Sequence, residues 1–548
     1  MKKLTYVFII LSLCLCAFML SSCEKTYDIV YELDGGVNSA ENPSEYQKGE
    51  TVKLNFPEKD GYMFAGWYSE PEHENLIMEI NADTKDDITL YARWERVEDV
   101  LTIKRVVRTT VIVGSNAVRE VIYSVTDCVE TAKLVVIPER YSGYPVEYIG
   151  DYAFKNCEQL EYVHIPYTVS DIGIEAFSDC KALKEINIPD KVSTIDNYAF
   201  QNCDSLKEVT LGKQVRSIGS CAFADCDMLS KVNFSDETFV NIGRYAFSNC
   251  DSLKEIELYK VNSFYQHIFA GCDSLEKLTV HNCSQSAYFQ LSVFDNCPVF
   301  KELVFGDDVK VRSFVYAPSM VEKITVSENN KYIMSLDGVV YSKDGKELIC
   351  YPKGKKDKEF TVPAGVTHIK DKAFSGNEYI ESVTIPDGVE YIGADAFSKC
   401  TNLKSIVISD SVTEIGARAF ANCSSLKTVK LSNSIEKINA STFSNCKALE
   451  IIKIPEGVRV IEANAFYNCI SLQSITIPYG VESIGIWSFG YCSLLKSIII
   501  PNSVIHMEAS AFESTPLVVY CEAENQPKGW KNGWDTGVKS VVWGYKEN

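Results

Sequence analysis

The sequence has no excess of basic residues and contains few histidines. Lys and Arg number 54 against 74 Asp and Glu, which gives a formal net charge of -20. Because binding to a phosphate backbone depends on Lys and Arg that displace counterions, we expect no nucleic-acid partner. The six histidines are scattered, and we find no Ser/His/Asp grouping, phosphate loop or His-Glu-x-x-His motif. Since a catalytic site needs unlike residues brought together, these absences predict a protein that is not an enzyme.

Two further absences limit the class of protein. No Cys-x-x-Cys pair follows the first 22 residues, which disfavours a zinc site, and we expect neither a metal nor a cofactor. Beyond residue 20, no run is apolar enough to span a bilayer. We therefore expect the bulk of the chain to lie outside the cytoplasm, behind a targeting segment at its start.

The first 22 residues resemble a lipoprotein signal peptide. Two lysines precede an apolar run that ends at Leu20, and the sequence Leu-Ser-Ser-Cys that ends at Cys23 is similar to a bacterial lipobox. The resemblance implies that residues 1–22 are removed and that Cys23 is lipidated, so that residues 23–26 form the anchored N-terminus. The alternative is an ordinary secretory signal that ends near a cysteine.

A repeat of 23 residues, with departures of one or two, fills most of the remaining chain. In one unit, Ile186 and Ile188 alternate with polar residues, as in a short strand with one buried face, and Pro189 ends that strand. A unit this small cannot bury its apolar face alone, so the period predicts a solenoid of stacked units. Phe374 and Phe512 keep the register without a cysteine. The pair Phe-x-x-Cys itself begins at Phe154, Phe177, Phe200, Phe223, Phe247, Phe269, Phe294, Phe397, Phe420, Phe443, Phe466 and Phe489.

The unit Leu-x-x-Ile-x-Ile-Pro-x-x-Val-x-x-Ile-Gly-x-x-Ala-Phe-x-x-Cys resembles the BspA-type leucine-rich repeat of bacterial surface proteins. The resemblance covers residues 123–520. It implies a mostly β leucine-rich-repeat solenoid, in which we expect the Ala-Phe segment to form a single helical turn. The Gly after Ile is replaced by Asp196, Lys370 and Glu462 in some units, so we expect that this position requires no positive φ angle and that its glycine is a convenience.

The repeat lapses between Phe294 and Phe374. Within this stretch, Asp344-Gly345 lies between two apolar segments, which indicates a β-hairpin. We expect a hairpin insertion near 329–358 that projects from the stack. A dense basic run follows the hairpin, and we interpret it as a solvated loop, with a contact site as the alternative. This run comprises Lys353, Lys355, Lys356 and Lys358.

Residues 27–95 differ in character from the repeats. The sequences Gly-Trp-Tyr at 66–68 and Ala-Arg-Trp at 92–94 resemble those of the Listeria-Bacteroides (internalin B-type) repeat, which implies a small β-grasp domain. We interpret its aromatic residues as core rather than as a platform for carbohydrate. We expect residues 96–122 to form a strand-rich linker and N-terminal cap, and residues 521–548 to form a C-terminal cap.

The cysteines number 20, and twelve of them follow the repeated Phe at the same position. We expect these twelve to form a ladder of free thiols that pack as small apolar residues. Disulfides are the alternative, although parallel side chains on successive units suit the dihedral angle of a disulfide poorly.

The best candidate for a binding site is the exposed face of the strands, where outward side chains of successive units form one polar strip. Glu255 and Glu257 point the same way about 7 Å apart, a separation that could serve a glycosidase pair. Nothing desolvates these carboxylates, so we favour a solvated face. The candidate face comprises Tyr162, His164, Glu185, Asn187, Glu208, Thr210, Lys231, Asn233, Glu255 and Glu257.

These features predict a bacterial cell-surface lipoprotein, attached to the membrane through its N-terminal lipid only, that acts as an adhesin or ligand-binding protein. The resemblance to BspA-like proteins implies a host extracellular-matrix protein, such as fibronectin or fibrinogen, or another surface protein as partner. The alternative function is a glycan-capture component of a surface nutrient-uptake system. A surface enzyme that uses Glu255 or Glu257 is a third hypothesis.

Overall fold

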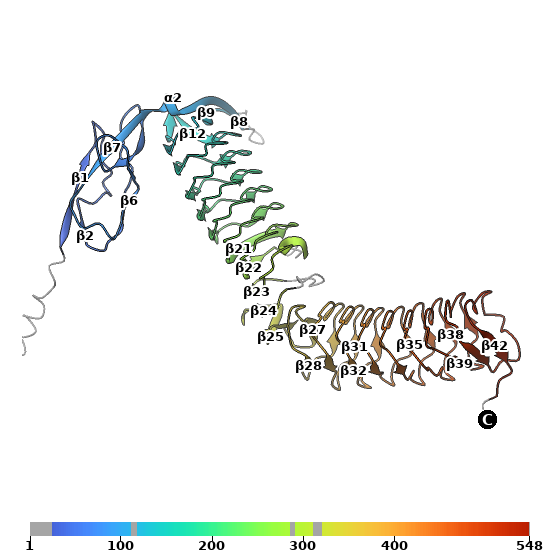
Figure 1. The fold of residues 1–548 in the computed structure, drawn as a ribbon. Helices are drawn as coiled ribbons and strands as arrows, with labels where there is room; N and C mark the ends of the chain where they lie inside the picture. The colour runs from blue at the N-terminus through green and yellow to red at the C-terminus, as the bar shows by residue number, and fades with distance from the viewer. Residues whose placement is uncertain (1–24, 111–117, 285–290, 311–319, 547–548) are drawn as a thin grey trace, which may run out of the picture. The chain divides into compact units, whose positions relative to one another are not determined.

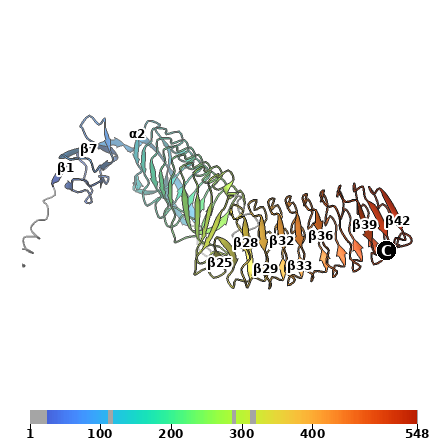
Figure 2. The same cartoon turned by 60° about the horizontal axis from the view of Figure 1, so that its bottom comes forward.

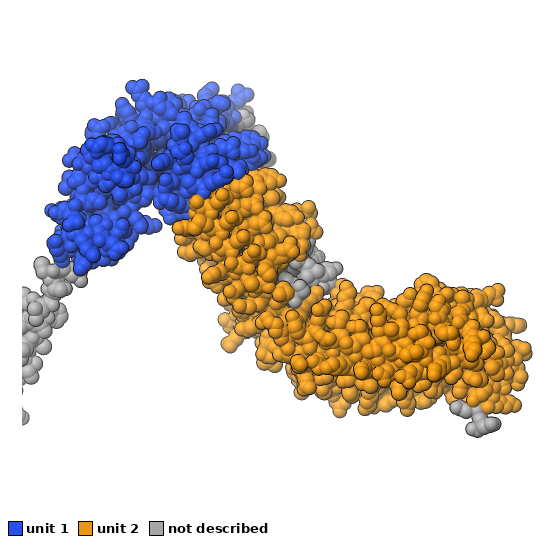
Figure 3. Space-filling view, viewed as in Figure 1, with its two compact units in different colours: residues 1–191 blue, residues 192–548 orange. Residues whose placement is uncertain are grey.

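The computed structural model describes residues 25–110, 118–284, 291–310 and 320–546, and it consists almost entirely of β-strands and turns (Figure 1). In these ranges the helical segments are α2 (Val97–Val100) and the 3₁₀ turn η1 (Leu291–Phe294). The chain forms two compact units, of which the first ends at Lys191 and the second begins at Val192 (Figure 3). The expected signal peptide and Cys23 lie outside the described residues. None of the described helices has the length and apolarity needed to cross a bilayer.

The first unit begins with a small β module. Its strands are β1 (Thr26–Glu32), β2 (Glu45–Gln47), β3 (Val52–Lys53), β4 (Tyr62–Tyr68), β5 (Leu76–Ile77), β6 (Glu79–Ile80) and β7 (Ile88–Arg96). The main sheet has the order β2-β1-β7-β4-β5, with β1 parallel and β4 antiparallel to β7. Tyr46, Phe64, Trp67 and Leu90 are buried in one core, and the Trp67 indole donates a 3.1 Å hydrogen bond to the carbonyl of Asn55. These aromatic side chains are therefore core residues, as expected.

A long hairpin leads from the module into the first coils. Its strands β8 (Leu101–Thr110) and β9 (Val118–Cys128) pair antiparallel, and β9 pairs parallel with β12 (Tyr144–Ile149). Because β9 occupies the edge of β12 that no earlier coil covers, the hairpin protects the open end of the sheet. The other strands of this unit are β10 (Leu134–Val136), β11 (Arg140–Tyr141), β13 (Tyr162–His164), β14 (Asp171–Ile172) and β15 (Glu185–Asn187).

The second unit is a stack of coils, and its first part precedes the hairpin insertion. Two kinds of strand alternate along the chain, and each pairs parallel with its equivalent in the next coil, as β17 does with β19 and β18 with β20. The strands are β16 (Thr194–Ile195), β17 (Glu208–Thr210), β18 (Ser217–Ile218), β19 (Lys231–Asn233), β20 (Val240–Ile242), β21 (Glu255–Phe264), β22 (Lys277–Cys283), β23 (Glu302–Phe305) and β24 (Lys323–Val326).

The second part of this stack is more regular (Figure 2). After an antiparallel meander it repeats the two parallel ladders, one containing β30-β32-β34 and the other β29-β31-β33. The strands are β25 (Ile333–Leu336), β26 (Val339–Ser342), β27 (Glu347–Cys350), β28 (Glu359–Thr361), β29 (His368–Ile369), β30 (Ser382–Thr384), β31 (Tyr391–Ile392), β32 (Ser405–Val407), β33 (Glu414–Ile415), β34 (Thr428–Lys430), β35 (Lys437–Ile438), β36 (Ile451–Ile452), β37 (Val460–Ile461), β38 (Ser483–Ile484), β39 (Ser497–Ile500), β40 (His506–Met507), β41 (Val518–Cys521) and β42 (Ser540–Trp543).

Two columns of side chains fill the core of the stack. The rings of Phe397 and Phe420 stack with centroids 5.3 Å apart and planes within 6°. The described cysteines are free, and the column cysteines are buried. Most of them donate the thiol to the carbonyl of the Phe one coil earlier, as Cys423 Sγ does to Phe397 at 3.1 Å, whereas Cys157 donates to the carbonyl of Cys128 at 4.0 Å. The buried ladder of thiols is confirmed, but these thiols also donate hydrogen bonds and are not simply small apolar residues.

The segment around each buried Phe is not the expected helical turn. In the coil of Phe420, Arg418 and Asn422 have φ angles of 56° and 63°. Two left-handed residues so close together exclude a right-handed helical turn, and the segment forms two hydrogen-bonded turns instead. Equivalent left-handed residues recur in the other coils, where Asn and Asp are frequent because their side chains tolerate this conformation.

The hairpin insertion does not project from the stack. β25, β26 and β27 pair antiparallel, with Asp344-Gly345 at the turn as expected, but β27 also pairs parallel with β29. The insertion therefore forms the first layer of the second set of coils. Tyr351 replaces the repeated Phe in this layer, and its ring stacks on Phe374 at 4.8 Å.

The far end of the stack is closed by aromatic side chains. β41 and β42 extend the ladder of β39, and Trp530 and Trp534 are buried in the core of the last coils. Thr515 stands where a column cysteine is expected, and its hydroxyl donates a 2.7 Å hydrogen bond to the carbonyl of Phe489. The end of the repeat thus keeps the hydrogen bond of the thiol ladder with a different donor.

Candidate functional site

The strand face of the second unit carries six of the ten predicted residues, and four of them form one hydrogen-bonded group. In the parallel pair β17–β19, Glu208 lies opposite Lys231 and Thr210 opposite Asn233. Lys231 Nζ lies 2.7 Å from Glu208 Oε1, and Asn233 Nδ2 donates to the same oxygen at 2.7 Å and to Thr210 Oγ1 at 3.1 Å. Because the side chains of Lys231 and Glu208 are 60% and 42% exposed, a macromolecule can reach this group.

The other two residues, Glu255 and Glu257, do not act as a pair. Glu257 accepts a hydrogen bond from the Tyr259 hydroxyl at 3.3 Å and lies 3.5 Å from His281 Nε2. The rings of Tyr259 and His281 stack at 4.6 Å with planes within 9°, and the charge of Glu257 raises the pKa of Tyr259. Since Glu257 is 53% exposed, its carboxylate is not desolvated as a general acid requires. The group suits contact with a ligand better than proton transfer.

The contribution of Tyr259 and His281 escaped the sequence analysis. Many units have Pro, Gly or Ser directly after the first strand, whereas here Leu258 is followed by Tyr259 and the strand β21 continues to Phe264. This extension places Tyr259 beside His281 on β22. The aromatic residue in place of Pro, Gly or Ser was the available signal.

In the first unit, the β module covers part of the first rung of the strand face. Leu134 on β10 belongs to the same core as Phe64 and Trp67, and Tyr162 on β13 packs against that core. The ring of His164 meets Phe56 edge to face at 5.4 Å, and its partial burial lowers the pKa of His164. Tyr162 and His164 therefore contact the module instead of standing free at the start of a binding strip.

The next rung borders an open groove. Glu185 and Asn187 on β15 are exposed, and together with Phe56, His164 and Tyr167 they line a cavity of about 490 Å³. One wall of this cavity comes from the module and the other from the first coils. The four predicted residues of this unit thus lie at or beside the junction with the module.

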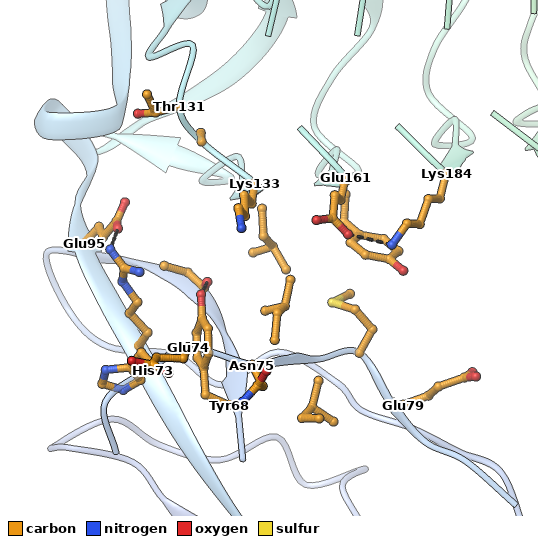
Figure 4. Close-up of a pocket in the computed structure, with 18 of the residues that line it drawn as sticks. Tyr68, His73, Glu74, Asn75, Glu79, Glu95, Thr131, Lys133, Glu161 and Lys184 are labelled. Atoms are coloured by element: carbon orange, nitrogen blue, oxygen red, sulfur yellow. Dashed lines mark hydrogen bonds and ion pairs between the residues drawn. The ribbon is translucent and has the colours of Figure 1, made fainter. Parts of the chain in front are cut away.

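A larger cavity of about 690 Å³ lies on the other side of this junction (Figure 4). The module contributes Tyr68 and Asn75 to its lining, and the coils contribute Lys133, Tyr162 and Lys184. Figure 4 shows Tyr68 and Lys133 facing the space between the two parts of the unit. Because its lining comes from positions between 65 and 184, no short motif of the sequence indicated this cavity.

Two of the three cations that line this larger cavity are paired with carboxylates. Lys184 pairs with Glu161 and lies over the ring of Tyr162, with Nζ 5.1 Å from the ring centroid. On the module side, Arg93 Nη2 lies 2.6 Å from Glu95 Oε1. A wide and polar space of this kind suits a hydrated ligand rich in hydroxyl groups.

The basic run after the hairpin is a loop that is solvated only in part. Lys355 is only 12% exposed and lies 3.0 Å from Asp337 and 3.1 Å from Asp357, both within the insertion. Lys356 and Lys358 are 64% and 76% exposed and pair with Glu322 and Glu381 of the neighbouring coils. Lys353 is partly buried, which lowers its pKa. Two of the four lysines thus link the insertion to the neighbouring coils through ion pairs.

The described residues offer no grouping of three or more His, Cys, Asp or Glu side chains that could hold a metal ion.

Comparisons with known proteins assign the two parts of the chain. The repeats match the BspA type leucine-rich repeat region in six copies, over residues 135–239, 229–336, 350–470 and 413–526. Residues 27–93 match the Listeria-Bacteroides repeat domain. No curated protein matches the chain.

Solved structures of similar proteins include three leucine-rich repeat proteins of bacteria. One from Bacteroides ovatus is 24% identical, with a TM-score of 0.46 over 77% of this chain and 98% of its own. One from Eubacterium ventriosum is 22% identical, with a TM-score of 0.44 over 76% and 97%. A leucine-rich cell surface protein from Faecalibacterium prausnitzii is 24% identical, with a TM-score of 0.37 over 78% and 91%. Because the repeat family matches more than half of its residues, this chain belongs to the BspA-type leucine-rich repeat family.

Proposed function

We propose that this protein is an exported, lipid-anchored bacterial surface protein that binds a protein ligand through the strand face of its second unit. The observation that carries the proposal is the pair of exposed polar groups on that face, one around Glu208 and Lys231 and one around Glu257 and His281. Both groups stand on short parallel strands whose register is set by the coil beneath, so their side chains are held in place before a ligand arrives. The strip acts as a contact surface without catalysis.

The proposed location rests on the start of the sequence. The apolar run that ends at Leu20 and the lipobox-like sequence that ends at Cys23 support export and lipidation. A lipid on Cys23 would tether the folded chain and leave the coils free to meet a partner. Mass spectrometry of the mature N-terminus tests this part: a diacylglyceryl group on Cys23 is expected, and an unmodified cysteine would contradict it.

The binding proposal is tested with the chain from Glu24 onward against fibronectin and fibrinogen, with a glycan array run in parallel. We expect binding to one matrix protein to fall about 10-fold or more when Lys231→Ala and His281→Ala are combined, because exposed contacts at the centre of an interface carry much of its affinity. The matched control is Lys404→Ala, which removes an ion pair with Glu381 elsewhere in the stack. If the unmodified chain, the double variant and the control variant bound equally well, the strand face would not be the binding site.

The larger cavity of the first unit favours a second candidate function, glycan capture. Its polar lining and the rings of Tyr68 and Tyr162 fit a saccharide, which needs hydrogen-bond partners and an aromatic surface. Lys184→Ala would then weaken oligosaccharide binding, whereas Lys231→Ala would leave it unchanged. A glycan array without any positive sugar would reject this candidate.

An enzymatic role remains the weakest of the three hypotheses. It would require Glu257→Gln or Glu255→Gln to abolish a turnover that the unmodified protein shows on a glycan or peptide substrate. We expect no such turnover, because the groups around Glu257 are exposed and no unlike pair of carboxyl environments separates an acid from a base.

A further inference from the structure

Two adjacent coils near the end of the second unit depart from the repeat on the outside of the Phe-x-x-Cys turn. Relative to the buried Phe, the position two residues earlier holds Asp395, Arg418, Ser441 and Asn464 in four successive coils, and then Trp487. The position two residues later holds Lys399, Asn422, Asn445 and Asn468, and then Tyr491. Other positions on these two coils also change from small or polar to large and apolar. The resulting apolar patch comprises Tyr467, Ile470, Ile486, Trp487, Tyr491 and Leu494.

Five of the six side chains of the apolar patch are exposed, and Tyr467 is partly exposed between two of them. Trp487, Tyr491 and Leu494 are 43%, 44% and 50% exposed. The ring of Tyr467 lies between the other two aromatic residues, with centroids 5.3 Å from Tyr491 and 6.4 Å from Trp487. Ile470 and Ile486, 39% and 38% exposed, extend the patch on the same two coils. A stack of coils needs no such patch for its own stability, because its core is already filled by the Phe and Cys columns.

Backbone conformation makes the two largest residues of the patch costly. Trp487 and Tyr491 have φ angles of 53° and 59°, in the left-handed region where bulky side chains are disfavoured. Asn464 and Asn468 hold the same positions one coil earlier, with φ angles of 57° and 59°, and Asn suits this region better. Tyr198 and Tyr245 hold the position of Trp487 in other coils with similar φ angles, whereas the position of Tyr491 holds Asn or Asp in most coils. Strain kept at the exposed Tyr491 indicates a function for its side chain.

The composition of the patch indicates that its occupant is a protein. Trp and Tyr are the residues that most often dominate protein–protein contacts, and the aliphatic Ile470, Ile486 and Leu494 need an apolar surface to cover them. A saccharide would stack on the rings but would bring hydroxyl groups against the aliphatic side chains. The perpendicular arrangement of Tyr467 and Tyr491, with planes 67° apart, also fails to provide a flat platform for a sugar ring.

The charges around the patch indicate the sign of the charge on that partner. Tyr491 donates its backbone N–H to the carbonyl of Glu513 at 2.7 Å, so this glutamate borders the patch on the next coil. Glu462 and Glu508 stand two residues before the positions equivalent to Trp487 in the coils on either side, but Glu462 already pairs with Lys437 at 3.9 Å. Glu508 and Glu513 therefore supply the negative charge beside the patch. On a chain with a net charge of -20, a second copy would be repelled, whereas basic side chains around an apolar surface would be attracted.

We therefore propose that the apolar patch is a second interaction surface, separate from the strand face, and that it docks a protein whose apolar contact surface is ringed by Lys and Arg. This surface is independent of the proposed adhesin function, since the two lie on different sides of the coil: one on the outward strand positions and one on the Phe-x-x-Cys turns. The partner is recognised by burial of Trp487, Tyr491 and their aliphatic neighbours, with the glutamates as the charged rim.

The test uses the chain from Glu24 onward and two synthetic peptides of equal length and charge. One is an amphipathic helix of leucine and lysine, and the other has serine in place of leucine. At physiological salt we expect the full chain to bind only the leucine-containing peptide, and the double variant Trp487→Asn/Tyr491→Asn to bind it about 30-fold more weakly, as expected when two central interface residues are lost. Both substitutions install the residues of the preceding coil, so the variant is expected to fold with unchanged or higher thermal stability.

The matched control is Tyr198→Asn/Tyr245→Asn. These tyrosines occupy the position of Trp487 in other coils, have φ angles of 59° and 57°, and are 39% and 41% exposed, but no group of exposed aliphatic residues surrounds them. This control should bind as the unmodified chain does. The proposal is overturned if the Trp487/Tyr491 variant keeps its affinity, or if the serine peptide binds equally well. It is also overturned if sedimentation shows a dimer that only this variant loses, because the occupant would then be a second copy.

Discussion

The β module at residues 27–93 and the coil stack of the second unit bury their aromatic side chains in opposite ways. In the module, Phe64 meets Trp67 and Trp94 edge to face at 5.3 and 5.6 Å. In the stack, Phe420 and Phe443 lie face to face at 5.5 Å with planes within 3°. The first arrangement closes a small core whose members are all different, whereas the second can be extended by one coil without changing its neighbours. Stability is therefore concentrated in a few residues of the module and distributed along the stack.

The two regions also differ in sulfur. Residues 27–93 contain no cysteine, whereas the stack has a buried thiol in almost every coil. In the stack most thiols of the Cys column link two coils through a hydrogen bond to a Phe carbonyl, as between Cys446 and Phe420 at 3.2 Å. Alkaline pH, core mutations and thiol substitutions should therefore affect the two regions unequally.

Alkaline pH is expected to have the largest effect on stability, and to destabilise the stack at a lower pH than the module. Burial raises the pKa of Cys400 and Cys492 from 9.0 to about 12, and raises that of Cys423 and Cys446 well above 9.0. Because the thiols of the unfolded chain ionise first, this stability is fully present below pH 9 and is lost as the pH rises toward 12. In the module, burial raises the pKa of Tyr31 from 10.0 to about 12. The module should therefore begin to lose stability only above pH 10.

Differential scanning calorimetry at a series of pH values checks this order. The transition of the stack should move to lower temperature from pH 9, and that of the module from pH 10. The variant Cys400→Ala/Cys492→Ala should make the slope for the stack less steep and leave the module unchanged. The role given to the thiols would be contradicted if the unfolding temperatures of both regions began to decrease at the same pH. It would also be contradicted if the variant did not alter the pH dependence of the unfolding temperature of the stack.

A single core substitution should unfold the module, whereas in the stack it should only lower the free energy of unfolding. Trp67 is 1% exposed, and Trp67→Ala is expected to cost about 3–5 kcal/mol of unfolding free energy, comparable with the whole stability of so small a module. Phe420→Ala removes a similar side chain, but its cost should be shared by the coils on either side. Hydrogen exchange followed by mass spectrometry separates the two outcomes. Tyr62→Ala, at a position 41% exposed, is the control and should change neither region.

The smallest effect is expected for one thiol of the column. Cys423→Ala removes the donor to the carbonyl of Phe397 and should lower the unfolding free energy of the stack by about 1 kcal/mol. Cys423→Thr should cost less, because Thr515 already donates to the equivalent carbonyl of Phe489 at 2.7 Å. Chemical denaturation of the two variants provides the comparison. A threonine variant less stable than the alanine variant would show that volume, not the hydrogen bond, determines this position.

The candidate site shows how far sequence reasoning reached. The outward positions of Glu208, Lys231 and Asn233 followed from the alternation of each strand. Their mutual hydrogen bonds were not predicted and appear only in the structure. The covering of Tyr162 and His164 by the module did not follow, because Phe56 lies more than a hundred residues earlier in the chain. The Glu257 group also required the structure, since only the extended strand β21 brings Tyr259 against His281.

By itself, the sequence determined the coil: its length, its first strand, the burial of Phe and Cys, and the β module before it. These features are local or periodic, so a pattern of spacing is enough to predict them. The tertiary structure alone decided where backbones approach closely and which outward residues stay free. Gly416 has no positive φ angle, as expected, yet a Cβ there would lie 2.5 Å from the backbone nitrogen of Ala394, so its glycine is more than a convenience. Such contacts join atoms of different coils, and their distances depend on how the coils stack.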